Sequence, residues 1–300
     1  MPASSANLGP AFDCAALALN LHLTVSASTR AEPGCLVDYH GPQPELVPTD
    51  ESNLIYRAIT AVCARNDSPP GGLSLLVESE IPIGVGLGSS AAAIVAGLLV
   101  GDELAGAASD EQGLLALATS MEGHPDNVAA ALLGGLVVAA EIGSLVVTRR
   151  TDIPSDLRFI VVTPARQMST TLSRAVLPEQ YARSDVVHNL QRVALLTACL
   201  FSGGFELRPE FFQDRLHQPQ RAPLVPGIAE CLALEHPDLL GVFLSGAGSS
   251  VTAITRRSAD EIAQRLRQQF ESAGMPAESR VLRAENVGAV KRPHRGVKPS

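Results

Sequence analysis

Lysine is nearly missing from this 300-residue chain. Its only two lysines, Lys291 and Lys298, lie in a polar segment at the C-terminal end. A Walker A loop, which needs a Gly-Lys-Ser/Thr sequence, is therefore excluded from the rest of the chain. Recognition of phosphate or carboxylate groups there must rely on arginine, on backbone N–H groups or on a metal ion. A catalytic lysine amine is excluded as well.

Excess positive charge and long apolar runs are also missing. The net charge is −8, which argues against binding to nucleic acid, because a phosphate backbone demands a basic face. Apolar stretches are interrupted by Gly, Asp or Glu well before the roughly 20 residues of a membrane span, so no membrane partner is expected. The first residues lack a charged region followed by an apolar one, so no secretory signal is expected either.

Cysteine is sparse and irregular. The five cysteines are odd in number and follow neither a CxxC nor a metal-ligand spacing: Cys14, Cys35, Cys63, Cys199 and Cys231. We interpret them as reduced and mostly buried, which predicts a cytoplasmic protein.

The sequence patterns that are present indicate a mixed α and β protein. Strands are expected at 73–79, at 132–140 paired with 144–149, at 158–163 and at 239–244, and helices at 89–104, 185–201 and 259–273. The short polar connection at 151–155 is the expected boundary between two domains. We therefore expect domains at 1–152 and 153–290, followed by a polar tail at 291–300.

A glycine loop between an expected strand and an expected helix is the strongest local motif, and it reads Pro82-Ile-Gly-Val-Gly-Leu-Gly-Ser-Ser-Ala-Ala-Ala93. A helix N-terminus offers free N–H donors and the positive end of the helix dipole, and glycine lets the backbone close around an anion. A dinucleotide-binding GxGxxG fits less well, since Ser89 stands at its last glycine when it is counted from Gly84. Taken alone, the loop is equally compatible with a turn that serves only packing.

Two further segments make a family resemblance plain. Segment 2–13, Pro-Ala-Ser-Ser-Ala-Asn-Leu-Gly-Pro-Ala-Phe-Asp, resembles the N-terminal substrate motif of the galactokinase, homoserine kinase and mevalonate kinase (GHMP) superfamily. The glycine loop is similar to the phosphate loop of these kinases, and segment 244–251, Leu-Ser-Gly-Ala-Gly-Ser-Ser-Val, to their C-terminal glycine loop. The first motif, together with Glu122-Gly-His-Pro-Asp-Asn-Val128, is most similar to homoserine kinases.

The resemblance covers nearly the whole chain and carries a fold and an activity with it. It implies an α+β, two-domain GHMP kinase fold, with an N-terminal ATP-binding domain that has a left-handed βαβ-type phosphate loop and a ferredoxin-like C-terminal domain. It implies a kinase of threonine biosynthesis that uses ATP and Mg²⁺ to phosphorylate the hydroxyl of L-homoserine. The sequence does not determine the oligomeric state, for which a homodimer is one option.

Two other functions stay open at this point. One is a GHMP kinase acting on a different small alcohol, and the other is a ligand-binding protein of GHMP fold with little turnover. Two arginines beside the substrate, Arg174 and Arg221, argue for a substrate with a carboxylate and against a different small alcohol. The presence of Glu122 and of the serine pair in the glycine loop argues against a ligand-binding protein with little turnover.

Substrate binding is implied by the resemblance for six residues. A guanidinium matches a carboxylate bidentately, which suits arginine for the substrate carboxylate. The implied roles are Asn7 and Asp13 for the ammonium group, Arg174 and Arg221 for the carboxylate, and His124 and Thr170 beside the substrate.

The nucleotide is expected to lie against both glycine loops. The residues implied for ATP are Asn53, Pro82, Ile83, Gly84, Val85, Gly86, Leu87, Gly88, Ser89, Ser90, Ala91, Gly246 and Gly248. Glu122 with the hydroxyl of Ser90, or of Ser89, is expected to hold Mg²⁺, because a hard cation prefers carboxylate, hydroxyl and phosphate oxygens.

The catalytic group is implied at Asp126, Asn127 or His124. Members of the superfamily often use an aspartate base assisted by a lysine, and this pair cannot be complete in a body without lysine. A loose transition state leaves little charge on the attacking oxygen, so positioning and the metal can supply most of the acceleration. We therefore favour a mechanism without a dedicated general base.

Each of these residues also has a purely structural alternative. Asp13, Asn7 and Asn127 are residue types that cap helices and form turns. Arg174 and Arg221 are also compatible with solvated positions on the surface. His124 is compatible with a structural histidine whose hydrogen bonds are satisfied within the protein, and Glu122 with an ordinary acidic residue at a helix end.

The sequence departs from the family pattern at several places. Alanine replaces a glycine at Ala11 and Ala16, a substitution that is costly where φ is positive. Val85 stands where a polar or basic residue is frequent, and Ser249 where proline is frequent. A strand usually precedes the first motif, which here begins at Pro2.

Overall fold

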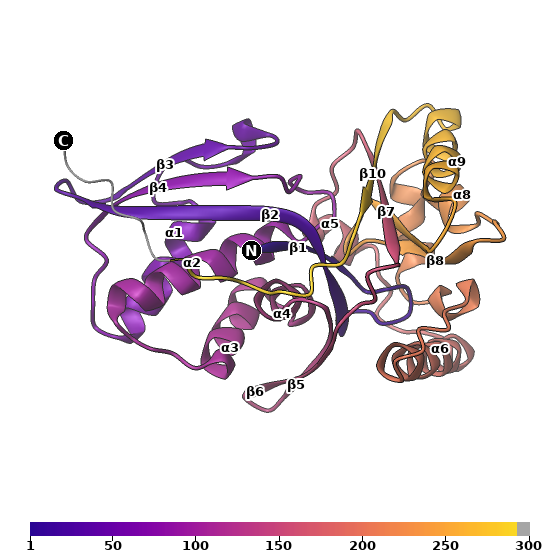
Figure 1. Cartoon of the computed structure of the whole chain (residues 1–300), viewed down its shortest axis with the longest axis horizontal. Helices are drawn as coiled ribbons and strands as arrows, with labels where there is room; N and C mark the ends of the chain where they lie inside the picture. Colours follow the sequence, from indigo (N-terminus) through magenta and orange to yellow (C-terminus); the bar gives the residue numbers. More distant parts are fainter. Residues whose placement is uncertain (293–300) are drawn as a thin grey trace.

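The computed structural model describes residues 1–292 and shows two α/β domains side by side (Figure 1). The first domain contains a six-stranded sheet of order β3-β4-β2-β5-β6, with β1 paired to β2. Its strands are β1 (Pro2–Ala6), β2 (Ala15–Arg30), β3 (Cys35–His40), β4 (Gly72–Ser79), β5 (Leu136–Ile142) and β6 (Leu145–Thr151). Its helices are α1 (Leu54–Arg65), α2 (Ser89–Ala105), α3 (Glu111–Glu122) and α4 (Asp126–Leu133), with a 3₁₀ turn at Pro44–Leu46.

The long strand β2 holds this sheet together. Leucines alternate with polar residues from Leu19 to Thr24, which is the period-two pattern of a strand with one buried face. The first part of β2 pairs with β1 and β5, and the part from Leu23 to Arg30 pairs with β4. Strands β3 and β4 run parallel and are joined by α1, so β3-α1-β4 is a βαβ unit, and the glycine loop follows directly after β4.

Helix α2 is held by close contact with α1, which fixes the position of its N-terminus. A Cβ atom at Gly97 would lie 2.3 Å from the carbonyl oxygen of Ile55, and one at Gly101 would lie 2.8 Å from that of Ile59. Only glycine permits this approach. The glycine loop at the start of α2 therefore rests on a rigid element.

The second domain has the expected ferredoxin-like order. Its four antiparallel strands are β7 (Arg158–Pro164), β8 (Leu239–Leu244), β9 (Val251–Thr255) and β10 (Ala277–Leu282), in the order β10-β7-β9-β8. Its helices are α5 (Thr170–Ala175), α6 (Arg183–Phe201), α7 (Gln218–Arg221), α8 (Ile228–Leu232) and α9 (Ala259–Ser272), with 3₁₀ turns at Pro209–Phe212 and Ala222–Leu224. Helices α8 and α9 cover one face of the sheet, and side chains of its other face, such as Phe159, belong to the core shared with the first domain.

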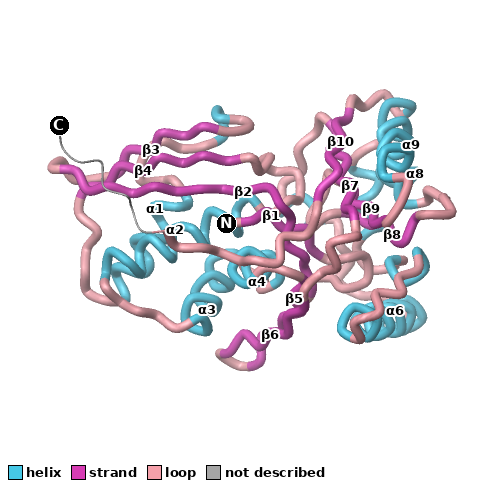
Figure 2. Tube along the Cα trace, in the orientation of Figure 1, coloured by secondary structure: helices cyan, strands magenta, loops and turns pink. Residues whose placement is uncertain are grey.

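After β10 the chain returns to the first domain, as Figure 2 shows. The N–H of Glu285 donates to the carbonyl of Ala18 at 2.9 Å, and the N–H of Gly135 donates to the carbonyl of Glu285 at 2.8 Å. Lys291 Nζ lies 2.8 Å from Asp102 Oδ2. Of the expected polar tail, residues 293–300 lie outside the described residues.

Most elements expected from the sequence are confirmed to within two residues. The strand expected at 132–140 was wrong at its start, because α4 continues to Leu133 and Gly134 and Gly135 then turn the chain with φ values of 71° and 67°. β5 begins only at Leu136. The connection between β6 and β7 spans residues 152–157, where the sequence predicts the domain boundary. No helix within residues 1–292 is long and apolar enough to cross a membrane.

Candidate active site

A pocket of about 250 Å³ is lined by both domains. It lies where the segment between β1 and β2, the glycine loop, the α3–α4 connection, α5 and the loop after β8 meet. Most of the residues predicted from the sequence line it: Asn7, Asp13, Ile83, Gly84, Gly86, Leu87, Gly88, Ser89, Ser90, Glu122, His124, Asp126, Asn127, Thr170, Arg174, Arg221 and Gly246.

Five predicted residues lie elsewhere. Pro82 and Val85 line a second pocket, on the Arg166 side of the glycine loop. Asn53 lines a neighbouring, largely apolar pocket, and its side chain caps α1 by accepting from Ile55 N at 2.9 Å. Ala91 and Gly248 are not among the lining residues of the pocket.

Carbonyl groups of the glycine loop are hydrogen-bonded to the rest of the protein, whereas the N–H groups of residues 84–91 have no acceptor among residues 1–292. The carbonyls of Gly84, Val85, Gly86 and Leu87 accept hydrogen bonds from Met168 N, Ser250 N, Ser245 Oγ and Ser4 N at 2.7–3.1 Å. No N–H group of residues 84–91 donates to an acceptor within residues 1–292. Since the same segment opens helix α2, these free donors and the helix dipole together form an anion site.

Two glycines are needed for the loop to lie where it does. Both Gly86 (φ 84°) and Gly88 (φ 67°) are in the left-handed region. A Cβ at Gly86 would lie 2.1 Å from the carbonyl oxygen of Ser245, and one at Gly88 would lie 2.0 Å from Ser4 Oγ. The loop is therefore clamped between β1 and the loop after β8.

Asp13 and Arg174 form a bidentate ion pair in the pocket. Arg174 Nη1 and Nη2 donate to the two carboxylate oxygens of Asp13 at 2.9 and 2.7 Å. Both side chains are about one third exposed, Arg174 at 38% and Asp13 at 32%. The pocket thus presents one acidic and one basic group that partner each other directly.

Arg221 is almost fully buried, at 2% exposure, which rules out the alternative of a solvated surface arginine. Its Nε donates to the carbonyl of Ser173 at 3.1 Å and its Nη1 to that of Gly246 at 3.1 Å. Burial, together with the nearby charge of Arg174, lowers the pKa of Arg221 to about 10. The group remains a cation at neutral pH.

Both the nitrogen and the oxygen of the Asn7 side-chain amide form hydrogen bonds within the protein. Its Nδ2 donates to the carbonyl of Gly246 at 2.8 Å, and its Oδ1 accepts from the N–H of Asp13 at 3.0 Å. It holds Asp13 in place and ties the first motif to the loop after β8. Contact between Asn7 and a substrate ammonium stays a prediction.

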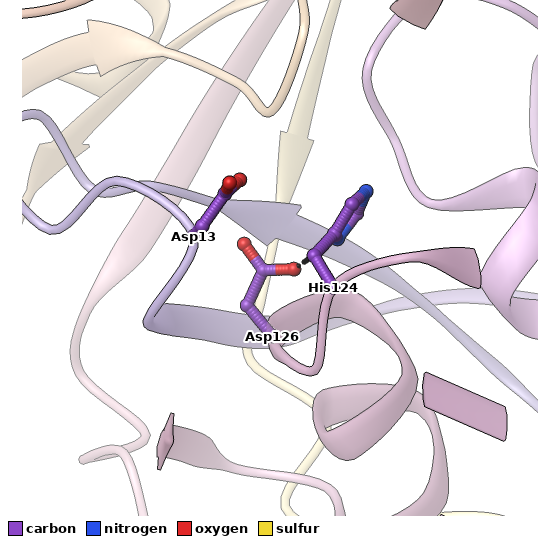
Figure 3. Close-up of side chains that lie close together, drawn as sticks. All are labelled: Asp13, His124 and Asp126. Atoms are coloured by element: carbon purple, nitrogen blue, oxygen red, sulfur yellow. Dashed lines mark hydrogen bonds and ion pairs between the residues drawn. The ribbon is translucent and has the colours of Figure 1, made fainter. Parts of the chain in front are cut away.

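Three side chains gather at the start of α4, as Figure 3 shows. His124 Nδ1 lies 2.6 Å from Asp126 Oδ1, while the other oxygen of Asp126 points toward Asp13. One ligand atom each of Asp13, His124 and Asp126 lies within 4.8 Å of the others. Burial lowers the pKa of His124, but its hydrogen bond to Asp126 and the charge of that carboxylate more than offset this, so the pKa is raised overall.

Glu122 ends α3 beside the glycine loop. Its Oε1 accepts a hydrogen bond from Ser90 Oγ at 2.6 Å, which joins the acid to the first turn of α2. Burial raises the pKa of Glu122, and the hydrogen bond from Ser90 partly counteracts this. A carboxylate and a hydroxyl in contact, next to free N–H groups, form a donor set that fits a magnesium ion held jointly with phosphate oxygens.

Asn127 follows Asp126 in α4 and is oriented by a residue that the sequence argument missed. Ser4 Oγ donates to Asn127 Oδ1 at 2.8 Å, and both groups are buried. Asn127 Nδ2 therefore faces away from Ser4. Ser4 lies inside the first motif, so its place in the Pro-Ala-Ser-Ser sequence was a usable signal.

The structure adds further lining residues that carried no motif signal. Met168 and Ser169 precede α5, and Ala247 lies between Gly246 and Gly248. The two alanines that replace family glycines, Ala11 and Ala16, do not have positive φ values, so they bring no backbone strain.

Comparison with known proteins assigns the class. The family model of the GHMP kinase N-terminal domain matches residues 53–135, and that of the GHMP kinase C-terminal domain matches residues 205–272. A crystal structure of Lactococcus lactis galactokinase in complex with galactose shares the fold with a TM-score of 0.66 at 13% identity, covering 97% of this chain and 94% of that one. The fold is that of a GHMP kinase.

Closer relatives identify the family within this class. Homoserine kinase of Moorella thermoacetica is 38% identical over 291 residues, covering 97% of this chain and 98% of that protein. Homoserine kinase of Deinococcus radiodurans is 45% identical over 257 residues, with 83% and 81% covered. The crystal structure of homoserine kinase from Cytophaga hutchinsonii superposes with a TM-score of 0.84 at 27% identity, covering 96% and 94% of the two chains. The chain belongs to the homoserine kinase family.

Proposed function

We propose that this protein transfers the γ-phosphate of ATP to the hydroxyl of L-homoserine, with Mg²⁺, and releases ADP and O-phospho-L-homoserine. The observation that carries this proposal is that one pocket combines an anion site of free N–H groups with the Asp13–Arg174 ion pair. An amino acid with a hydroxyl at the end of its side chain complements both parts.

The charges of the pocket match those of a zwitterion. The ammonium group of L-homoserine would take the place of Arg174 at Asp13, and its carboxylate would take the place of Asp13 at Arg174. Arg221 adds a second guanidinium beside Arg174, since both lie over the ring of Phe12 at 5.1 and 5.5 Å from its centroid. A neutral alcohol offers neither an ammonium nor a carboxylate group to replace the Asp13–Arg174 contact, so it gains no charge-assisted bonds there, which disfavours its binding.

The nucleotide has a matching site next to the substrate. Its phosphates would accept from the free N–H groups of residues 84–91. A neighbouring apolar pocket of about 190 Å³ shares Ile83, Ser89 and Ser90 with the first and would hold the adenine. Leu54 and Val77 are among its apolar lining residues.

Glu122 and Ser90 would hold Mg²⁺, which neutralises charge on the phosphates when it is bound. The protein's own part is to orient the reactants. The hydroxyl of the substrate would lie near Asn127 Nδ2, which Ser4 orients. Asp126 Oδ1 already accepts from His124 Nδ1 and Asn127 N, so this oxygen is committed to holding the loop.

The cysteines support a location in the cytoplasm, which we also propose. All five are free thiols, three of them buried. A reducing compartment that supplies ATP is where such a protein is stable and active.

The test is a coupled assay of ADP release with ATP and Mg²⁺. We expect L-homoserine to be used at least about tenfold better than a neutral alcohol of similar size, because one lost charge pair costs about 1.4 kcal/mol or more. Mevalonate, galactose, L-serine and L-threonine serve as competing substrates. Equal rates with mevalonate or galactose would defeat the proposal.

A further inference from the structure

Two nitrogens of the buried guanidinium of Arg221 are bonded to the protein, and the third has no partner among residues 1–292. Nε and Nη1 donate to the carbonyls of Ser173 and Gly246, and Nη1 also lies 3.2 Å from His217 Nδ1. Nη2 has no hydrogen-bond partner among residues 1–292, and Arg221 lines the pocket. The open Nη2 group is therefore what Arg221 offers to a ligand.

His217 is fully buried, and its surroundings determine which ring nitrogen carries the proton. Nε2 lies 2.8 Å from the carbonyl oxygen of Gly9 and 3.6 Å from Asp214 Oδ2, both of which are acceptors. Nε2 must therefore carry the hydrogen. Burial lowers the pKa of His217, so the ring is neutral and its Nδ1 is free to accept from Arg221 Nη1.

The ring of His217 is itself held rigidly. Asp214 Oδ2 accepts from the N–H groups of His217 and Gln218 at 2.8 and 2.6 Å. The ring stacks on Phe12, with 5.1 Å between centroids and an angle of 27°. An acceptor in a fixed position thus faces one particular nitrogen of Arg221.

We propose that His217 is a positioning residue: by accepting from Nη1, it fixes the plane of the Arg221 guanidinium and presents Nη2 to the carboxylate of the substrate. This inference rests on the proposed function, because it assigns the carboxylate of L-homoserine to Arg221. His217 does not line the pocket, so it would act on the substrate only through Arg221. Its effect is expected in the binding of L-homoserine and not in that of ATP.

Two amide substitutions separate the two hydrogen bonds of the ring. In His217→Asn the amide oxygen lies close to the former Nδ1 and retains an acceptor for Arg221. In His217→Gln the amide nitrogen lies close to the former Nε2 and retains the donor to Gly9, but the acceptor for Arg221 is lost. We expect His217→Gln to raise KM for L-homoserine at least fivefold, with kcat and KM for ATP within twofold of the wild type, and His217→Asn to stay within twofold on all three.

A substrate analogue and a second histidine provide the controls. (S)-2-amino-1,4-butanediol has the ammonium and hydroxyl groups of L-homoserine but no carboxylate, so kcat/KM for it should be equal in the wild type and His217→Gln. His236 has a side chain with 4% exposure and also accepts through Nδ1, in this case from Asp238 N at 3.1 Å. His236→Gln should leave both KM values unchanged.

The outcomes that overturn the inference are distinct from those that overturn the function. An active wild type with an unchanged KM in folded His217→Gln, or an equal rise in both variants, would defeat the positioning role alone. If His217→Gln does not fold, a tenfold rise in KM for L-homoserine in folded His217→Asn is enough to reject it. A wild type that is inactive on L-homoserine would defeat the proposed function and, with it, this inference.

Discussion

The two acidic side chains of the α3–α4 connection are used differently. Asp126 accepts from His124 and from its neighbour Asn127, and it is 1% exposed. Among residues 1–292, the side chain of Glu122 has a single hydrogen-bonding partner, the hydroxyl of Ser90 in the first turn of α2. One acid therefore shapes the α3–α4 connection, while the other joins α3 to the first turn of α2, where we propose that phosphate binds.

This difference predicts which acid matters more for turnover. Glu122→Gln should lower kcat by on the order of 10², because an amide is a poor ligand for a hard cation. Asp126→Asn should cost less than about tenfold, because the amide oxygen still accepts from His124. The measurement is kcat at saturating ATP, L-homoserine and Mg²⁺, with folding checked by circular dichroism. A loss of 10² to 10⁴ in folded Asp126→Asn would identify it as a general base.

The buried His217 predicts a dependence of stability on pH. Its pKa is lowered by burial, so the folded state stays neutral while the unfolded chain takes up a proton below its ordinary pKa of about 6.5. Stability is therefore lost as the pH falls from about 6.5 toward the lower folded pKa, by at most about 1.4 kcal/mol per pH unit.

His217→Asn removes this contribution and should flatten the dependence. Urea unfolding at pH 7 and pH 5 measures the free energy of unfolding of both proteins. The wild type should lose more stability between the two values than the variant does. Parallel losses would mean that His217 titrates in the folded protein as it does in the unfolded chain.

Individual site residues were predictable where they fall inside short motifs, and their partners were not. The sequence identified Asp13, Arg174 and Arg221, but it assigned the first two to opposite ends of a substrate and missed their direct contact. That contact joins residues 161 positions apart and depends on how the domains meet. Asp214 and His217 escaped notice because their role comes from burial, which no local pattern of the polar segment 213–220 reveals.

At the scale of elements, the glycine loop and α2 carry the site. The loop was predictable because glycine spacing and the following apolar run are local signals. Strand β2 was missed even though its leucines alternate, because its first residues adjoin the substrate motif. The strand start expected at 132 was wrong, since an apolar run does not by itself distinguish the end of a helix from a strand.

Alanine substitutions at the two ends of α2 test the role of the loop. Gly88 and Gly106 both have positive φ, so each should lose about 1 kcal/mol of stability from backbone strain. A Cβ at Gly106 meets nothing within 4 Å, whereas one at Gly88 would displace Ser4. Gly88→Ala should raise KM for ATP at least about tenfold, a loss of about 1.4 kcal/mol, while Gly106→Ala leaves it unchanged. Equal KM values in the two folded variants would argue against the loop as the phosphate site.

At the scale of the whole molecule, the two domains are joined by direct bonds around the pocket and again at the returning end of the chain. Ser5 Oγ lies 2.7 Å from Ser245 Oγ beneath the site. Asn286 pairs with both backbone groups of Ile153, accepting from its N–H at 2.8 Å and donating to its carbonyl at 3.0 Å. The segment after β10 thereby fastens the connection between the domains.

Asn286→Ala should therefore destabilise the protein by about 1–3 kcal/mol, because it leaves a backbone donor and an acceptor without partners. Chemical denaturation followed by circular dichroism and by activity provides the measurement. Asn20→Ala, which removes a single exposed acceptor for Arg283 N, is the matched control and should cost less. A loss in Asn286→Ala no larger than that of the control would mean that the returning segment does not fasten the connection.

The near absence of lysine has a practical consequence for chemical labelling. Amine-directed acylation can attach groups only to the α-amino terminus, Lys291 and Lys298. No lysine within residues 1–292 lines the pocket, so acyl-phosphate nucleotide probes that capture kinases by reacting with a lysine beside the phosphates should label this site poorly. A surface carrying activated esters will react with these same few amines, and Lys291, whose Nζ lies 2.8 Å from Asp102 Oδ2, does not line the pocket. The same composition that excludes a Walker A loop therefore spares the pocket residues from amine-directed chemistry.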